Sequence, residues 1–227
     1  MAQTVSLQEN RYREERPGDR TRRSREVGVG KSGSMEGKTV RKAGERLGVL
    51  SAKHRSGEEG GPIRFAVART DLGWVLVAGT VRGLCAIDLG DSRRALIDAL
   101  KVRFGREEYS EGDPESVRWL RRVTASIVSP RRVLDLPLDI RGTAFQRRVW
   151  QELRRIPTGT TASYGEVARR IGKPRSARAV ARACATNPLP LAVPCHRVVR
   201  SDGALGGYRG GVERKRALLE REGGIMP

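Results

Sequence analysis

The pattern of hydrophobic and polar positions changes near residue 61. Before it, stretches such as REERPGDRTRRSREVGVGKSGS contain almost no bulky apolar side chain. A segment of this kind cannot offset the entropy lost on ordering, because it has too little apolar surface to bury. We therefore predict a disordered basic arm over residues 1–60 and packed structure after it.

Residues 61–140 are predicted to form a small α/β domain. Three short β-type runs, IRFAVART, LGWVLVAGT and LCAIDLG, are separated by Asp, Gly and Thr, which predicts three antiparallel strands. SRRALIDALKVRF then repeats apolar residues at helical spacing after a cap at Asp91 or Ser92. A second helix is expected over 115–128, and LDLPLDIRG is either a further strand or an extended connector. This block shows no site, and Cys85 within it is interpreted as a core residue.

Residues 141–227 are predicted to be mainly helical. TAFQRRVWQELRRIP places its apolar side chains on one face of a helix that Thr143 can cap. SYGEVARRIG and SARAVARACATN predict two short helices around the turn KPR, the first ended by Gly172 and the second opened by Ser176. VERKRALLERE predicts a last helix. The expected fold class is therefore α/β (α+β), with a helix-turn-helix in the C-terminal part.

The charge of the chain indicates its partners more than its fold. The formal net charge is +19, which favours nucleic acid, although a solvated Arg-rich surface would give the same total. Residues 141–182 alone contain eleven Lys or Arg and two acids. Arg178 and Arg182 share a face of the second short helix, and Ala177 and Ala179 leave room for another surface to approach closely. These arginines could contact DNA, or they could be the wet side of an Ala-rich core helix.

Cysteine usage and hydropathy exclude several classes of protein. Cys85, Cys184 and Cys195 are too scattered for a disulfide framework or for zinc-ligand spacing. No apolar run approaches the roughly 18 residues of a membrane span, and the N-terminus lacks the apolar core of a secretory signal. GVGKS resembles a phosphate-binding loop, but the required glycine before it is Arg25 and no strand precedes it. We expect a cytoplasmic protein with no membrane partner, no metal and no nucleotide.

The stretch LAVPCHRVVRSDG sets Cys195 beside His196. A thiol with a pKa of about 8.5 needs a base to become the reactive thiolate, and an imidazole can take its proton. Neighbouring side chains often diverge, however, and a carboxylate is needed to orient the histidine; Glu220 and Glu222 are candidates. The residues alone leave three interpretations of Cys195: a nucleophile, a metal ligand, or a buried thiol beside a surface histidine.

The motif PCHRV over residues 194–198 resembles the signature of the O6-alkylguanine-DNA alkyltransferases, or methylated-DNA–protein-cysteine methyltransferases. Asn187 before it and GALGGYRGG after it fit the same signature, and the likeness extends from near Ile63 almost to the end of the chain. Within the family the chain looks most like the C-terminal half of the bacterial adaptive-response protein. The resemblance implies a small ribonuclease H-like domain followed by a winged helix-turn-helix catalytic domain.

The resemblance also implies an activity. Such a protein transfers the alkyl group of O6-alkylguanine or O4-alkylthymine in DNA to its own cysteine, irreversibly, once per molecule and without a cofactor. The implied partner is double-stranded alkylated DNA, entered through the minor groove with the damaged nucleotide flipped out. The protein is expected to act as a monomer.

Individual roles follow from the resemblance. Cys195 would accept the alkyl group, His196 would act through a bound water as its base, and Glu222 would orient His196. Tyr164 would donate a hydrogen bond to the departing purine, and Arg178 would fill the gap left by the flipped nucleotide.

The resemblance places further residues around the cysteine and at the DNA. Asn187 would join the recognition helix to the cysteine segment, and Tyr208 with the Gly206–Gly211 loop would form a wall of the base pocket. The other residues expected at the substrate or the DNA are Ser163, Ala177, Ala179, Arg182, Val198, Gly206, Gly207 and Arg209.

Two departures limit what the resemblance implies. The adaptive-response relative carries an N-terminal zinc domain with four cysteines, whereas residues 1–60 here contain none. Zinc, phosphotriester repair and transcriptional activation are therefore not expected. Gly210 and Gly207 stand where that relative has an aromatic residue and a serine, which leaves the preferred size of the alkyl group open.

Two other functions compete with alkyl transfer. A lesion sensor would bind DNA without turnover, but relatives of that type replace the cysteine. A Cys-His hydrolase would turn over many times on an ester or amide, instead of reacting once.

Overall fold

The computed structural model describes residues 62–105, 108–130 and 134–223. The predicted arm over residues 1–60 and the GVGKS motif lie outside the described residues. Below, residues 62–130 are called the sheet half and residues 134–223 the helical half. Among the described residues, no helix has the length and apolar character needed to cross a membrane.

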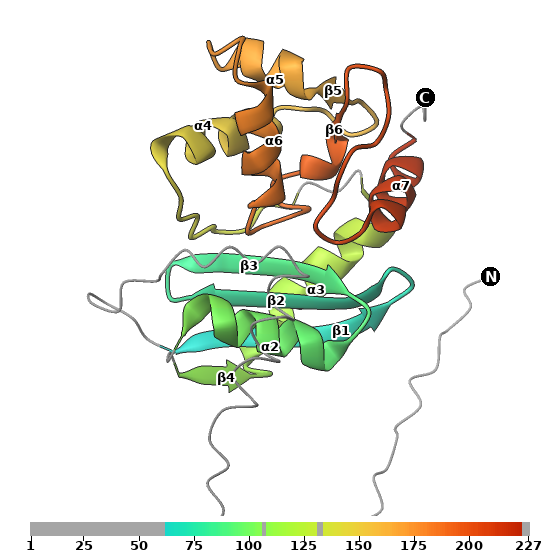
Figure 1. Ribbon diagram of the computed structural model, residues 1–227. Helices are drawn as coiled ribbons and strands as arrows, with labels where there is room; N and C mark the ends of the chain where they lie inside the picture. Colours follow the sequence, from blue (N-terminus) through green and yellow to red (C-terminus); the bar gives the residue numbers. More distant parts are fainter. Residues whose placement is uncertain (1–61, 106–107, 131–133, 224–227) are drawn as a thin grey trace, which may run out of the picture. The chain divides into compact units, whose positions relative to one another are not determined.

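The sheet half is built on four strands (Figure 1). The chain forms β1 (Ile63–Thr70), β2 (Gly73–Thr80) and β3 (Gly83–Gly90) as an antiparallel meander, which confirms the three predicted strands. β4 (Tyr109–Glu111) then pairs in parallel with β1, so the order is β3-β2-β1-β4. The sequence did not predict β4, because three residues are too few to show an alternating pattern.

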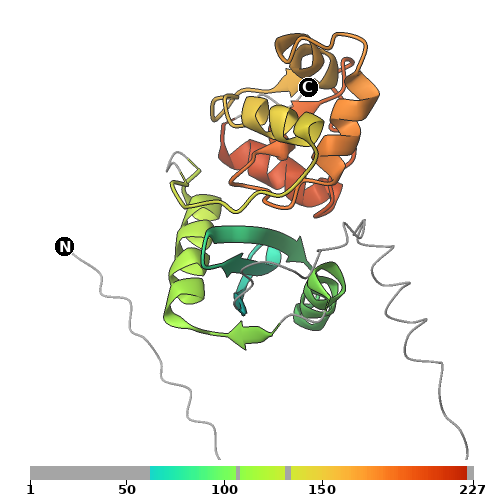
Figure 2. The same cartoon turned by 90° about the vertical axis from the view of Figure 1, so that its left-hand side faces the viewer.

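Helices α2 (Arg93–Phe104) and α3 (Pro114–Val128) cover opposite faces of this sheet (Figure 2). Of the two candidate caps, Ser92 opens α2, with its hydroxyl accepting from the Ala95 amide at 3.3 Å. The carboxylate of Asp113 accepts from the first turn of α3 in the same way. Each helix buries one apolar stripe: α3 lies against β1 and β2, and α2 lies against β2 and β3.

The helical half begins with three short helices, α4 (Ala144–Leu153), α5 (Tyr164–Arg170) and α6 (Ala177–Ala185). As predicted, Thr143 caps α4, and it does so in a reciprocal capping box. α5 and α6 are the two helices expected around the KPR turn. The indole nitrogen of Trp150 in α4 donates to the Ala183 carbonyl of α6 at 2.9 Å, which fixes the inner face of α6 against the core.

The rest of the helical half positions the cysteine. A parallel pair of two-residue strands, β5 (Ala162–Ser163) and β6 (Val198–Val199), joins the start of α5 to the segment after the cysteine. The 3-10 turn η1 (Cys195–Arg197) precedes β6, and α7 (Val212–Arg221) is the last helix of the described residues. The sequence predicted α7 but neither short strand.

Residues 134–143 form an extended connector that leads into α4. Among the described residues it makes one isolated β-bridge, between Leu138 and Leu84 of β3, where the Leu84 amide donates to the Pro137 carbonyl at 2.8 Å. Further along the same edge of β3, the Ile87 amide donates to the Pro188 carbonyl at 2.9 Å. Main-chain groups of the helical half thus occupy the free edge of β3, which brings the cysteine segment to the end of this strand.

Candidate active site

Asn187 fixes the backbone around Cys195. It follows α6, is 1% exposed, and its side-chain amide donates to the Val193 carbonyl at 2.7 Å and to Cys195 Sγ at 3.1 Å. Its carbonyl oxygen accepts from the Leu189 amide at 3.0 Å. All hydrogen-bonding groups of this amide face the loop between α6 and η1, so one side chain links the helix to the thiol.

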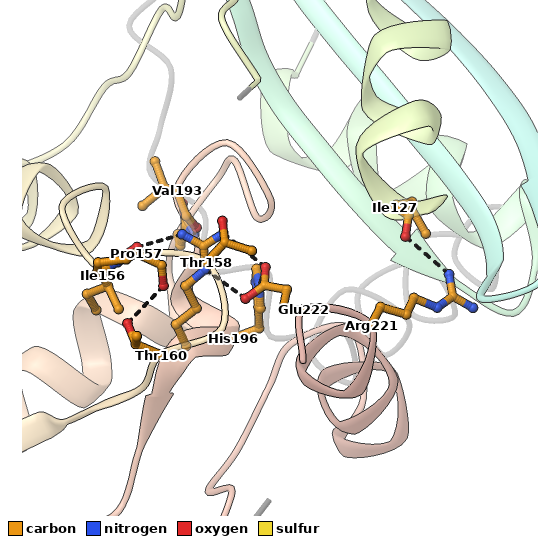
Figure 3. Close-up of polar contacts among 11 residues, drawn as sticks. Ile127, Ile156, Pro157, Thr158, Thr160, Val193, His196, Arg221 and Glu222 are labelled. Atoms are coloured by element: carbon orange, nitrogen blue, oxygen red, sulfur yellow. Dashed lines mark hydrogen bonds and ion pairs between the residues drawn. The ribbon is translucent and has the colours of Figure 1, made fainter. Parts of the chain in front are cut away.

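A carboxylate lies against the histidine beside the cysteine (Figure 3). His196 Nε2 is 2.8 Å from Glu222 Oε1, and both side chains are buried. Glu222 follows directly after α7, whereas Glu220, the other candidate from the sequence, is exposed on that helix. The structure therefore places Glu222, and not Glu220, at His196.

Arg197 was missed by the sequence analysis and holds the carboxylate from its other side. Its Nε and Nη2 atoms donate to both oxygens of Glu222 at 2.9 Å. The same guanidinium donates to the Ile156 carbonyl at 2.6 Å and to Thr158 Oγ1 at 3.0 Å. Both carboxylate oxygens of Glu222 therefore accept hydrogen bonds, Oε1 from His196 and Arg197 and Oε2 from Arg197. These bonds fix the orientation of the carboxylate.

The hydrogen bond to Glu222 determines the tautomer of His196. Burial lowers the pKa of His196, while the bond to Glu222 opposes this shift, so the ring is neutral at neutral pH. An ionised carboxylate only accepts, and Nε2 must therefore carry the ring proton. Nδ1 is then the basic nitrogen, and it is buried with no hydrogen-bond partner among the described residues. The imidazole is prepared to take a proton at Nδ1.

The cysteine is buried in a setting that contains two positive charges. Burial raises the pKa of the Cys195 thiol; the hydrogen bond from Asn187 and the charges of Arg209 and Lys215 oppose that increase. Among the described residues, no hydrogen bond joins the thiol directly to the His196 ring.

Lys215 is a second residue that the sequence analysis missed. It lies in α7 and is fully buried. Its ammonium group donates to the Val198 carbonyl at 2.5 Å and to the Leu205 carbonyl. Burial lowers the pKa of Lys215, and the neighbouring Cys195 opposes that shift. Lys215 thus joins α7 to the strand after the cysteine and leaves a positive group inside the site.

Two tyrosines and a glycine lie near the thiol. Burial and the nearby Cys184 and Cys195 raise the pKa of Tyr164 to about 12, so its hydroxyl keeps its proton. Gly206 has φ +66°, and a Cβ there would lie 3.1 Å from the Tyr164 hydroxyl, which favours glycine at this position. The Tyr208 hydroxyl is buried without a partner in the described part of the chain.

The glycines that depart from the adaptive-response relative have different surroundings. A Cβ at Gly210 would lie 2.9 Å from the Tyr208 ring and 3.5 Å from Leu89 Cβ, so a side chain there would require the ring to move. A Cβ at Gly207 would meet nothing within 4 Å.

The outer face of α6 carries the residues predicted to contact DNA. Arg178, Ala179 and Arg182 are exposed and Ala177 is partly exposed, while Val180 on the opposite face is fully buried. Neither Arg178 nor Arg182 makes a side-chain hydrogen bond or ion pair with another described residue. Their charges are therefore available to an external anion.

Three other residues predicted to contact the substrate or the DNA are instead buried or bonded to other residues of the chain. The Ser163 hydroxyl caps α5 by accepting from the Glu166 amide at 3.1 Å. Val198 is fully buried, and its carbonyl accepts from the Lys215 ammonium group. Arg209 pairs with Asp88 of the sheet half, with 2.6 Å between Nη2 and Oδ1.

The stability of the site is expected to depend on pH through Glu222. Burial raises the pKa of this carboxyl, but hydrogen bonds from His196 and Arg197 outweigh burial and bring the pKa to about 2, below the ordinary 4.5. A depressed carboxyl pKa adds stability that is complete above the unfolded pKa and is lost as the pH falls from about 4.5 to about 2. Urea midpoints of the wild type and Glu222→Gln should therefore converge over this interval. A constant difference between the two proteins would contradict the expectation.

Comparison with known proteins adds a family match. A family model described as 6-O-methylguanine DNA methyltransferase, DNA binding domain, matches residues 144–224. The chain is 50% identical over 182 residues to the bifunctional transcriptional activator/DNA repair enzyme Ada of Escherichia coli, which covers 80% of this chain and 51% of that protein. It thus spans about half the length of this curated relative.

Two further relatives are matched over most of their length. The methylated-DNA–protein-cysteine methyltransferase of Shigella flexneri is 38% identical over 158 residues, covering 67% of this chain and 90% of that one. The crystal structure of Mycobacterium tuberculosis OGT in complex with DNA is 37% identical, with a TM-score of 0.60, covering 70% of this chain and 92% of that one.

Proposed function

The chain belongs to the methylated-DNA–protein-cysteine methyltransferase family, and on this premise we propose that it repairs DNA by moving an alkyl group onto Cys195. The substrates are O6-alkylguanine and O4-alkylthymine in double-stranded DNA, and each molecule reacts once. The observation that carries the proposal is a buried thiol, held at 3.1 Å by Asn187, beside a histidine whose tautomer is fixed by Glu222 at 2.8 Å.

The proposed reaction begins with a proton transfer. The Cys195 thiol gives its proton through a water to Nδ1 of His196, and Glu222 stabilises the imidazolium that forms. The thiolate attacks the alkyl carbon, so that a carbon–sulfur bond forms while the bond from that carbon to O6 breaks. The guanine leaves as an anion, and the hydroxyl of Tyr164, which keeps its proton, donates a hydrogen bond to it. The thioether is stable, and the reaction ends there.

Reaction in a duplex requires the damaged base to leave the stack, because its O6 atom is not accessible in the paired helix. The exposed arginines and small residues of α6 support entry of this helix into the minor groove, with Arg178 filling the gap. The M. tuberculosis relative has been crystallised with DNA, which supports the same partner.

We also propose the predicted domain division. Residues 61–140 would form a ribonuclease H-like domain, and residues 141–227 a winged helix-turn-helix domain that acts as a monomer. The start of the family match at residue 144 supports this boundary.

A mass measurement tests the activity. After incubation with excess duplex containing O6-methylguanine, the chain should gain the mass of one methylene group, located on the peptide with Cys195. Cys195→Ala should keep its original mass and still bind the duplex. An unchanged wild-type mass with intact binding would indicate a lesion sensor instead, and repeated turnover on esters would indicate a hydrolase.

Arg178→Ala is expected to slow transfer from duplex DNA about tenfold, because a loss of about 1.4 kcal/mol in stabilising the flipped state changes its population by that factor. Transfer to the protein from the free modified base should be unaffected. Arg122→Ala on α3, which removes the same charge from an exposed helical position, is the matched control. Equal duplex rates for Arg178→Ala and the wild type would exclude the flipping role.

A further inference from the structure

One carboxylate of the sheet half lies between two arginines. Asp88, in β3, is 2.7 Å from Arg103 Nη2 through Oδ2 and 2.6 Å from Arg209 Nη2 through Oδ1. The exposed fractions of the three side chains are 8% for Asp88, 12% for Arg103 and 14% for Arg209. Arg209 also donates to the Ile87 carbonyl at 3.2 Å. A loop residue of the helical half is thus bound to the sheet half by a largely buried ion pair.

This cluster borders the reactive thiol. Asp88, Arg103 and Arg209 line a cavity of about 20 Å³ that Cys195 and Tyr208 also line. The remaining wall is formed by Leu89, Leu96, Ala99, Pro190 and Gly210. A space of this size holds about one water molecule, so little solvent separates the arginines from the sulfur. Two guanidinium groups and one carboxylate leave one net positive charge beside the thiol.

We propose that Asp88 is a positioning residue for alkyl transfer: it holds the Arg209 guanidinium beside Cys195 and fixes the loop that carries Tyr208. The inference rests on the proposed function, since it concerns the thiolate that this function requires. Asp88 touches neither the substrate nor the sulfur and acts through Arg209.

The loop needs such an anchor. Gly206 and Gly211 have φ +66° and +97°, so the backbone at both ends of the loop adopts conformations that favour glycine. Arg214 holds the Gly210 carbonyl at 2.6 Å, but this bond does not place the Arg209 side chain. A buried arginine without a counter-ion would turn toward water, because desolvation of its charge is costly. The ion pair with Asp88 compensates this cost and keeps the Arg209 side chain in its buried position.

Apart from Arg209 and Tyr208, the groups near the sulfur are held by contacts that do not involve Asp88. Lys215 is bound to main-chain carbonyls of the helical half. The remaining titratable or polar groups around Cys195 are Asn187, His196, Cys184, Tyr164 and Tyr208. Asp88 influences the pKa of Tyr208 but is not among the causes of the Cys195 shift, whereas Arg209 is. Loss of Asp88 therefore acts on the thiol through the position of Arg209.

The test measures thiol reactivity and transfer in parallel. Cys195 is labelled with iodoacetamide across a pH series without DNA, and single-turnover transfer is followed with O6-methylguanine duplex. Asp88→Asn is expected to raise the apparent thiol pKa by about one unit, which lowers labelling and transfer at neutral pH about tenfold. Arg209→Gln should do the same, and the double variant should be no slower than either single variant. Asp98→Asn is the matched control: it breaks the largely exposed pair with Arg94 in α2 and should leave the profile unchanged.

Several results would overturn the assignment. Asp88→Asn could unfold at lower urea while keeping the wild-type pH profile, which would leave only a structural role. It could label faster at neutral pH, which would mean that its negative charge opposes the thiolate. If Asp88→Asn does not fold, a wild-type profile for Arg209→Gln refutes the proposal. If the wild type labels but transfers nothing, the proposed function fails, and the labelling profiles still decide the role of Asp88.

Discussion

Glu222→Gln is expected to slow alkyl transfer by about 10²- to 10⁴-fold, the usual contribution of general-base catalysis, with little change in DNA affinity. The carboxylate accepts from His196 at one oxygen and from Arg197 at both. A glutamine is neutral and has one side-chain oxygen: with this oxygen at the Oε1 position its amide hydrogens face Arg197 Nε, and in the opposite orientation they face His196. The imidazolium that forms during thiol deprotonation therefore loses its stabilising charge, and the tautomer of His196 is no longer fixed.

Glu220→Gln provides the matched control for this prediction. It removes the same charge two residues earlier, from the exposed side of α7, and should transfer at the wild-type rate. Both rates are measured under single-turnover conditions, with folding verified by urea unfolding of each protein. A Glu222→Gln rate within a factor of about three of the wild type would mean that the thiolate forms without this relay.

The sequence predicted most of the helices and long strands because their hydrophobic periods extend over many residues. The meander of β1, β2 and β3 and the helices α2 to α7 follow from such patterns, and caps such as Ser92 and Thr143 are local chemistry. The strands β4, β5 and β6 have two or three residues, and their pairing depends on where the packed helices bring the chain. No local pattern could reveal them.

The sequence identified Cys195 and His196 but not all of the groups around them. Glu220 and Glu222 could not be separated, because the choice depends on α7 ending at Arg221 and turning the next residue inward. Arg197 was indistinguishable from many other arginines in a chain with 45 basic residues.

Two of the missed charged residues left a signal in the sequence. Lys215 lies three and four positions before the buried Leu218 and Leu219, so helical spacing places it on the inner face of α7. Asp88 interrupts the apolar run of β3, whose residues are all buried. A buried charge needs an oppositely charged partner. Asp88 has two, Arg103 and Arg209.

Asn187→Asp is expected to reduce transfer at neutral pH by about 100-fold or more, equivalent to about two units of thiol pKa, and to destabilise the fold by about 1–3 kcal/mol. The native amide donates to both the Val193 carbonyl and the Cys195 sulfur. An ionised aspartate would place negative charge against both acceptors and oppose the thiolate. A protonated aspartate has one hydrogen and can satisfy only one of them, so either form leaves the site with a buried group unpaired.

Gln151→Glu is the matched control for the aspartate change. It also replaces an amide with a carboxylate, but at an exposed position of α4. Its transfer rate and urea midpoint should stay close to those of the wild type. For Asn187→Asp, transfer should recover partly as the pH rises and more thiolate forms. A wild-type rate at neutral pH together with a lowered midpoint would show that Asn187 only shapes the loop, and that the thiolate is stabilised by the neighbouring positive charges alone.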